Sequence, residues 1–289
     1  MRFGFHFMDY NLPGEPESIP GLLAESARAA EEVGASWFTV MDHYFQMEQF
    51  RTAHDPMLEA YLQLGYVAAV TERMRLGTIV TGVTYRHPGL LAKIVTGLDV
   101  LSHGRAFLGI GAAWYEREHL ALGVEYPPLG TRFEMLEEAI RIALQMWSDD
   151  EGPFEGEHYH LAETINVPRS IQRPHPPIVI GGAGERKTLR LVAQYGDATN
   201  LIVQNPDEAA HKLDVLRRWC DELDRDYDAI EKTVQARAQV FEDADAFVGL
   251  AEAYAAIGIE HIHFGGLGPD VPGTIRRFGD QIAPRIAGL

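Results

Sequence analysis

The amino-acid sequence predicts a (β/α)₈ barrel, the TIM-barrel fold, formed as a single domain over residues 1–289. Short apolar segments alternate with amphipathic stretches along the whole chain, and eight such pairs can be counted. Strict alternation of strands and helices requires a parallel sheet, and eight parallel strands close into a barrel. A length of 289 residues also suits one barrel domain.

Each expected strand is a short run of apolar and β-branched residues. In the first, Phe3, Phe5 and Phe7 alternate with smaller or polar residues, which is typical of a strand. The eight expected strands span residues 3–7, 37–41, 75–80, 105–111, 176–182, 198–203, 233–241 and 259–266.

Helix boundaries are predicted from capping residues. Apolar residues three and four apart indicate a first helix that starts near Ile19 and is stopped by Gly34. Thr131 and Glu134 have the spacing of a capping box for the fourth helix. Three further helices are expected to start at a residue followed by proline. Proline suits the first turn of a helix, because the N–H that it lacks would have no partner there. These pairs are Asp55-Pro56, His87-Pro88 and Asn205-Pro206.

The segment from residue 149 to residue 175 breaks the alternation. It is long, polar and rich in aromatic residues, glycine and proline, and it lies between the fourth helix and the fifth strand. We therefore expect an insertion packed over the barrel, with a short hairpin around Phe154 to Leu161.

Composition limits the classes of partner. A net charge of −17, from 42 acidic and 25 basic residues, repels nucleic acid and anionic lipid surfaces. We find no apolar run long enough to cross a membrane and no signal-peptide pattern at the amino terminus, so we expect a cytoplasmic protein. The single cysteine, Cys220, excludes an internal disulfide, and helical spacing predicts that it packs in the core. These properties favour a small-molecule substrate.

Catalytic residues of barrel enzymes lie at the carboxyl ends of the strands. Asp42 and His43 directly follow the second strand, so this titratable pair is placed to act on a ligand at that end. The alternative is an aspartate that caps local backbone beside an exposed histidine. The other segments expected at this end are Met8 to Tyr10, residues 81–87, 111–118, 181–186 and 200–204, Arg237, and residues 261–266.

A glycine-rich turn connects the fifth strand to the following helix. Gly181, Gly182 and Gly184 allow backbone N–H groups to face a phosphate at the positive end of that helix, and Arg186 and Lys187 add positive charge. Such a turn is a weak signal alone, but phosphate sites recur on the late strands of this fold.

Two histidine pairs invite a metal interpretation. His261 and His263 share one face of a strand, and His158 and His160 lie in the insertion. Neither pair has a third ligand at suitable spacing, so we expect no metal and assign the first pair to a filled barrel interior.

Several stretches resemble the luciferase-like monooxygenase superfamily. They are LGTIVTGVTYRHPGLLAKIVTGLDVLSHGRAFLGIGAAWYEREHLALG from residue 76, MDHY from residue 41, and PPIVIGGAGERKTLRLVAQYGDATN from residue 176. Within the superfamily the chain is most similar to oxidoreductases that use coenzyme F420, a deazaflavin. Enzymes that use flavin mononucleotide (FMN) share the scaffold.

The resemblance implies roles for individual residues. Asp42 and His43 match the acid–histidine pair beside the cofactor ring, which makes His43 a proton donor or acceptor. A bulge with a non-proline cis peptide bond, matching Ile79-Val80, is expected behind the ring. The residues implied to contact the cofactor are Asp42, Ile79, Val80, Gly111, Ala112, Gly181, Gly182 and Gly184.

One departure from the family pattern concerns the substrate. Deazaflavin sugar-phosphate dehydrogenases of this superfamily carry a glutamate just after the fourth strand, where Trp114 stands here. Glu116 is the nearest substitute acid. Arg51, Arg86 and Lys187 would have to bind the coenzyme's polyglutamate tail.

Three functions follow from these observations. The first is an F420-dependent oxidoreductase that transfers a hydride between the deazaflavin and a small organic substrate, expected as a homodimer. The second is an FMN-dependent monooxygenase that uses reduced flavin and O₂. The third is a non-catalytic barrel that serves as the partner subunit of a catalytic homologue.

Overall fold

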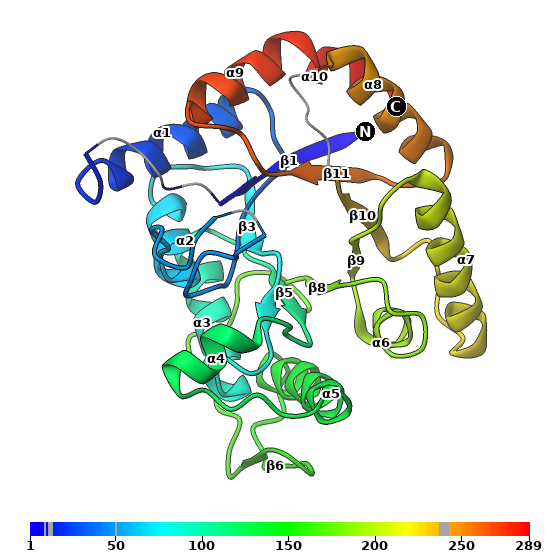
Figure 1. The fold of residues 1–289 in the computed structure, drawn as a ribbon. Helices are drawn as coiled ribbons and strands as arrows, with labels where there is room; N and C mark the ends of the chain where they lie inside the picture. Colours follow the sequence, from blue (N-terminus) through cyan, green and yellow to red (C-terminus); the bar gives the residue numbers. More distant parts are fainter. Residues whose placement is uncertain (9, 11–13, 50, 237–242) are drawn as a thin grey trace.

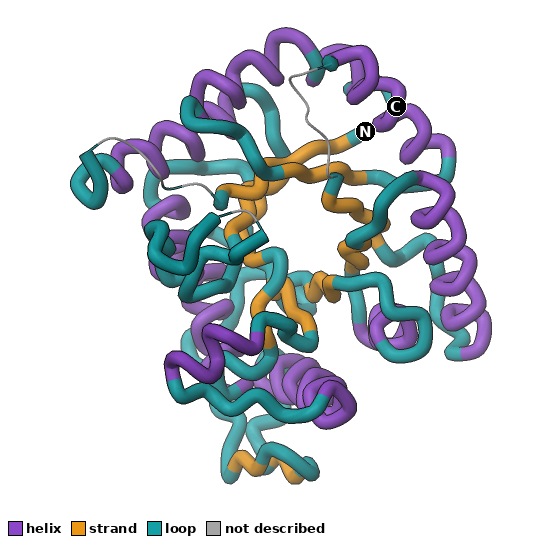
Figure 2. The backbone as a smooth tube through the Cα atoms, in the orientation of Figure 1, coloured by secondary structure: helices purple, strands orange, loops and turns teal. Residues whose placement is uncertain are grey.

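The computed structural model describes residues 1–8, 10, 14–49, 51–236 and 243–289. Nine strand segments form one parallel sheet curved into a ring, with the order β3-β2-β1-β11-β10-β9-β8-β5-β4 (Figures 1 and 2). They are β1 (Arg2–Phe7), β2 (Trp37–Val40), β3 (Arg75–Thr78), β4 (Thr81–Gly82), β5 (Leu108–Gly111), β8 (Ile178–Gly181), β9 (Ala198–Leu201), β10 (Glu231–Gln235) and β11 (His261–Phe264).

The nine segments correspond to the eight predicted strands, because β3 lies within the predicted third strand and β4 continues it for two residues beyond the break. The sheet closes where this strand meets the chain before β5. The amide of Leu76 donates to the carbonyl of Arg105 (2.9 Å), and the amide of Phe107 donates to the carbonyl of Leu76 (3.0 Å). The predicted (β/α)₈ barrel is thus confirmed, with its third strand interrupted.

Helices surround the ring of strands on the outside (Figure 2). They are α1 (Ile19–Glu32), α2 (Ala60–Ala68), α3 (Pro88–Leu101), α4 (Glu116–Leu122), α5 (Leu129–Met146), α6 (Thr188–Tyr195), α7 (Pro206–Glu222), α8 (Ala244–Ala256), α9 (Val271–Gln281) and α10 (Ala283–Ile286). In the part of the chain that the structure describes, no helix is both long and apolar enough to span a bilayer.

Two predicted helix starts are confirmed. Asn205 caps α7, its side-chain oxygen accepting the amide of Glu208 at 2.9 Å. His87 precedes α3, and its Nδ1 accepts the amide of Gly89 at 3.2 Å. In both helices a proline occupies the first turn.

The predicted start of α2 at Asp55-Pro56 is wrong. The Asp55 carboxylate accepts the backbone amide of Thr52 at 2.7 Å and so closes a local turn instead. Glu59 caps the helix, accepting the amide of Leu62 at 2.6 Å, and α2 begins four residues later than expected, at Ala60.

The predicted capping box of α5 is also wrong. The helix begins at Leu129, so Thr131 lies inside its first turn rather than at its boundary. Pro128 occupies the capping position and supplies no side-chain hydrogen bond. Proline's fixed backbone angle suits a helix start, and that property outweighed the polar spacing further along.

The insertion contains the predicted hairpin, made of β6 (Phe154–Glu155) and β7 (His160–Leu161). The hairpin lies outside α5 and away from the ring of strands (Figure 1). The carboxylate of Glu138, on α5, accepts the backbone amides of Glu157, His158 and Tyr159 and fixes the hairpin there.

The end of the insertion does reach the barrel, as expected: Gln172 Nε2 donates to the carbonyl of Ala106 at 2.6 Å, and His175 lies beside the start of the strands.

Two different cores fill the molecule. Between strands and helices lies a large apolar cluster that includes Phe5, Phe264 and the predicted core thiol of Cys220. Inside the barrel a small apolar cluster around Trp37 and Phe107 is accompanied by fully or almost fully buried polar side chains. These include His6, Thr39, Asn200, Thr233, His261 and His263, which confirms the predicted interior position of the last two.

Candidate active site

The carboxyl ends of the parallel strands meet at one end of the barrel, which we call the mouth. Asp42 and His43 follow β2 at this end, and Gly111 and Gly181 are the last residues of β5 and β8. Asp9 and Arg237, also expected here, lie outside the described residues.

His43 forms a close pair with a carboxylate. Its Nδ1 lies 2.6 Å from Oε1 of Glu118, a fully buried residue of α4. The same carboxylate accepts the backbone amides of Tyr44 (2.8 Å) and Phe45 (3.2 Å) and the hydroxyl of Tyr85. Glu118 therefore connects α4 to the loops that follow β2 and β4.

Two opposing effects act on the pKa of Glu118. Burial raises it, but the hydrogen bond and charge of His43, the Tyr85 hydroxyl and the Tyr44 amide together outweigh burial and lower the pKa below its usual value. The group is thus ionised near neutral pH.

The ionised carboxylate fixes the orientation of the imidazole. Because a carboxylate can only accept hydrogen bonds, Nδ1 of His43 carries the hydrogen and Nε2 of the neutral ring can take up a proton. The side chain of His43 is 12% exposed, so it is held by the protein and still reachable from outside. This arrangement suits a general base or acid.

The structure places Glu116 apart from this pair, as an exposed residue at the start of α4. Glu118, which sequence reasoning missed, occupies the position beside His43. The spacing of the residues could have identified it. Glu118 and His119 lie three and four residues after Tyr115, which puts all three on the buried side of one short helix.

Asp42 belongs to a buried ion pair. Arg86 Nη1 lies 2.6 Å from Asp42 Oδ2, Arg86 Nη2 lies 3.0 Å from Oδ1, and Arg86 also contacts Glu59. Burial raises the pKa of the Asp42 carboxyl, although the hydrogen bonds and charge of Arg86 act against it. Burial also opposes the positive charge on Arg86, but there the paired Asp42 carboxylate prevails and raises the arginine pKa. Arg86 would therefore have to give up these contacts to bind a polyglutamate tail.

The peptide bond between Ile79 and Val80 is cis, as the family resemblance implied. The side chain of Val80 packs between two of the predicted cofactor glycines. A Cβ atom built on Gly111 would come within 2.9 Å of a Val80 methyl group, and one on Gly181 within 2.8 Å. Four predicted site residues are therefore brought together at the mouth.

Ala112 follows β5 in the same region. Its carbonyl accepts Arg132 Nη1 at 3.0 Å, and the carbonyl of Ala113 accepts the same nitrogen at 2.6 Å. Arg132 is buried against the ring of Tyr126, 4.1 Å from its centroid, so it fixes the shape of this turn.

The glycine-rich turn after β8 leads into α6, which has no side-chain cap. Gly182 has a φ of +119°, which residues with side chains rarely adopt. A Cβ on Gly184 would lie 2.9 Å from Thr188 Oγ1. Arg186 and Lys187 are exposed beside these uncapped N–H groups, so the turn suits an anionic group such as a phosphate.

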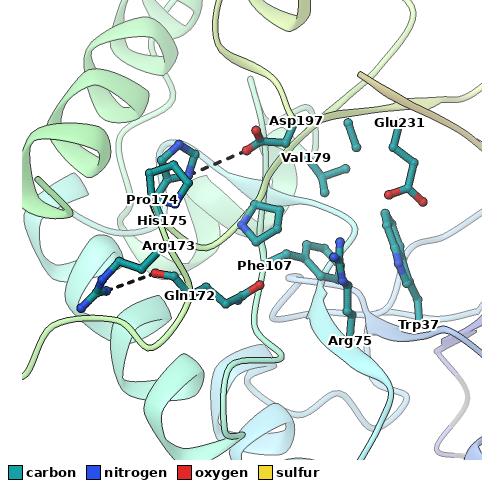
Figure 3. Close-up of a pocket in the computed structure, with 12 residues that line it drawn as sticks. Trp37, Arg75, Phe107, Gln172, Arg173, Pro174, His175, Val179, Asp197 and Glu231 are labelled. Atoms are coloured by element: carbon teal, nitrogen blue, oxygen red, sulfur yellow. Dashed lines mark hydrogen bonds and ion pairs between the residues drawn. The ribbon is translucent and has the colours of Figure 1, made fainter. Parts of the chain in front are cut away.

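A cavity of about 340 Å³ lies at the opposite end of the barrel (Figure 3). It is lined by residues that begin strands, among them Trp37, Arg75 and Glu231. Glu231 pairs there with Arg2 at 3.1 Å. Because barrel enzymes carry out their chemistry at the carboxyl ends of the strands, we assign this cavity no part in the reaction.

The described residues contain no group of three or more histidine, cysteine, aspartate or glutamate side chains that could hold a metal ion. His158 pairs instead with Glu134 at 3.2 Å, and His160 with Glu155 at 2.9 Å.

A family model described as luciferase-like monooxygenase matches residues 1–272. The chain belongs to the luciferase-like monooxygenase family. It is therefore related to oxidoreductases, and its parallel barrel surrounded by helices is the fold of that family.

Two curated relatives of this luciferase-like chain, both F420-dependent glucose-6-phosphate dehydrogenases, differ in sequence identity and in the length matched. The protein of Kineococcus radiotolerans is 38% identical over 169 residues, which are 58% of this chain and 49% of that protein. The chain thus matches about half the length of that relative. The protein of Amycolatopsis mediterranei is 25% identical over 93% of this chain and 96% of its own.

Solved structures share the fold at low identity. An F420-dependent secondary alcohol dehydrogenase aligns with a TM-score of 0.83 and 19% identity, over 99% of this chain and 98% of that one. The FMN-bound oxygenating component of 3,6-diketocamphane monooxygenase from Pseudomonas putida aligns with a TM-score of 0.72 and 16% identity, over 99% of both chains.

Proposed function

We propose that the protein is an oxidoreductase dependent on coenzyme F420 that transfers a hydride between the deazaflavin and a small organic substrate. The observation that carries this proposal is the His43–Glu118 pair, which lies at the mouth that also holds Val80 and the glycine-rich turn. Both curated relatives described above are F420-dependent dehydrogenases, which favours F420 over FMN.

The residues at the mouth fit such a cofactor. Val80, Gly111 and Gly181 are packed so closely that side chains on the two glycines would be excluded, which keeps this surface smooth. The uncapped start of α6, with Arg186 and Lys187, would hold the cofactor phosphate. When bound, the deazaflavin supplies the carbon that accepts or donates the hydride.

The protein's own contribution is proton transfer. Nε2 of His43 takes the proton from a substrate hydroxyl when that substrate is oxidised, and returns it to a carbonyl oxygen in the reverse direction. Glu118 stabilises the imidazolium that forms, as the carboxylate of a catalytic triad does.

The FMN-dependent monooxygenase is the second candidate, because an FMN-bound enzyme shares the fold. The third candidate, a non-catalytic partner subunit, is disfavoured by the retention of the His43–Glu118 pair. A homodimer stays a prediction, to be tested by light scattering after size-exclusion chromatography.

Binding measurements test the cofactor assignment. Purified protein is titrated with oxidised F420 and with FMN, and F420 is expected to bind more tightly. Micromolar FMN binding without measurable F420 binding would overturn the proposal.

Variants of the glycine-rich turn test where the phosphate binds. Arg186→Gln should weaken F420 binding, because Arg186 is exposed and makes no hydrogen bond or ion pair within the described residues. Arg28→Gln, an exposed change on α1, is the control and should bind normally. Gly182→Val should weaken binding further, with folding checked by circular dichroism. Unchanged dissociation constants in both variants of the turn would remove it from the site.

A further inference from the structure

The surface beside His43 is aromatic. Trp114 is 49% exposed, stacks on Tyr115 with ring centroids 5.2 Å apart, and meets the His43 ring edge-on at 5.5 Å. Tyr115 also meets His43 edge-on, at 5.7 Å. A large aromatic side chain half exposed beside a proton-transfer group is well placed to contact a ligand.

Apolar side chains continue behind this surface. Tyr115 belongs to a small apolar cluster with two buried methionines, and partly buried side chains extend it. Its members are Met8, Met41, Phe45, Met47, Met57 and Tyr115. The surroundings of Tyr115, and so of the Trp114 ring that stacks on it, are therefore apolar.

Among the described residues, the arginines on the segments that follow β2, β4 and β5 already have partners. Arg86 is bound to Asp42 and Glu59, Arg117 to Glu48, and Arg132 to the carbonyls of the turn after β5. Arg51 also has an interaction partner. None of these side chains could bind a substrate phosphate without losing contacts that the protein already makes.

The negative charge around His43 also disfavours a phosphorylated substrate. Glu118 is an anion directly behind His43, and the chain carries a net charge of −17. A phosphate group carries about two negative charges and is normally bound by arginine or lysine side chains free to pair with it. A phosphorylated substrate would therefore be repelled at this position.

We propose that the substrate is an uncharged secondary alcohol or ketone with an apolar body, and not a sugar phosphate. Its oxygen contacts Nε2 of His43 and its body packs on Trp114, which makes Trp114 the specificity-determining residue. This inference rests on the proposed function. In oxidation, the carbon loses a hydride to the deazaflavin and the hydroxyl loses its proton to His43, which gives the ketone. Reduction reverses both transfers.

The first experiment measures binding without turnover. Cyclohexanol and glucose 6-phosphate are tested for protection of tryptophan fluorescence against acrylamide quenching, with the cofactor-free and the F420-loaded protein. Trp37 and Trp147 are buried and Trp219 is partly buried, so the Trp114→Phe variant defines the contribution of Trp114. Cyclohexanol should protect Trp114. Protection by glucose 6-phosphate and not by cyclohexanol would overturn the inference.

The second experiment uses kinetics. Trp114→Ala should raise KM for cyclohexanol about tenfold or more, because the apolar contact is lost, while Trp114→Phe should stay within about threefold. Tyr66→Ala, an exposed aromatic on α2, should leave KM unchanged. Equal KM in wild type and Trp114→Ala would overturn the specificity role.

The two proposals fail separately. If F420 does not bind, the proposed function fails, and the fluorescence protection measured without cofactor still decides the substrate class. If F420 binds and glucose 6-phosphate is oxidised while cyclohexanol is not, the proposed function stands and this inference is wrong.

Discussion

The carboxylate of Glu118 lies 2.6 Å from Nδ1 of His43, although the two residues are 75 positions apart in the chain. The contact joins the end of β2 to α4, a helix of seven residues. Because Glu118 is fully buried and also accepts two backbone amides, its position is fixed independently of any ligand.

Replacing Glu118 tests its role as the positioning residue for His43. An amide in Glu118→Gln can donate to Nδ1 and so select the wrong tautomer, as is known for catalytic triads. Turnover should fall by about 10²–10⁴-fold, with the dissociation constant of the cofactor changed little. Glu116→Gln, an exposed change two residues away, is the matched control and should keep near-normal turnover. A larger loss in Glu116→Gln would restore the assignment made from sequence.

Removing the imidazole tests proton transfer directly. His43→Ala should lower turnover by ~10²–10⁴-fold and leave cofactor affinity nearly unchanged, since the ring acts on the substrate. The comparison variant is His160→Ala, on the hairpin outside α5, which should behave as wild type. Equal turnover in His43→Ala and wild type, measured with any accepted substrate, would assign His43 to packing.

The Asp42–Arg86 pair is predicted to matter for stability. The Arg86 side chain is 10% exposed and that of Asp42 is 1% exposed, so Arg86→Met leaves a buried carboxylate unpaired. The free energy of unfolding should fall by about 3–5 kcal/mol, and the double variant with Asp42→Asn should recover part of this loss. Arg117→Met breaks an exposed pair and should cost at most about 1 kcal/mol. Denaturant unfolding gives the free energy of unfolding of the wild type, the two single variants and the double variant. An equal loss in the two single variants would contradict the prediction.

Stability should fall in mild acid because histidines are buried inside the barrel. Burial, and to a smaller extent the charge of His43, lowers the pKa of His6 to about 4 from its usual 6.5. The unfolded chain therefore takes up a proton below pH 6.5 that the folded protein refuses, so stability present above pH 6.5 is lost down to about pH 4.

The size of this effect can be measured with one variant. The contribution of His6 is on the order of 3 kcal/mol, and His263, whose pKa burial lowers to about 3, adds to it. His6→Asn keeps a donor for Thr39 and does not titrate, so the decline in unfolding free energy between pH 6.5 and 4 should be shallower. The exposed change His160→Asn should leave the slope as in wild type. A slope unchanged in His6→Asn would mean that other groups cause the decline.

The sequence predicted the barrel because alternation of strands and helices is repeated eight times and therefore survives local errors. The residues at which helices start were predicted less accurately. At Asp55 a polar side chain closed a turn with Thr52 instead of capping a helix, and short-range patterns do not distinguish these outcomes. The position of the hairpin could not be predicted either, because it depends on the contact between Glu138 and the hairpin amides.

The site was predicted in part. His43 and the cis bond at Ile79-Val80 were identified, but the acid beside His43 was not. Choosing between Glu116 and Glu118 requires the start of α4 to within one residue, because a helix rotates by about 100° per residue. The orientation of Asp42 depends on Arg86, 44 positions later, which no local pattern reveals.

The packing of Val80 between Gly111 and Gly181 couples three positions that are far apart in the sequence. A side chain at either glycine needs the space that Val80 occupies, so such a change is tolerated only if residue 80 becomes smaller first. When such substitutions accumulate during evolution, residue 80 should therefore become smaller before a side chain appears at position 111 or 181. In a library that varies all three positions, the variants that still fold should have a nearly constant summed side-chain volume at residues 80, 111 and 181.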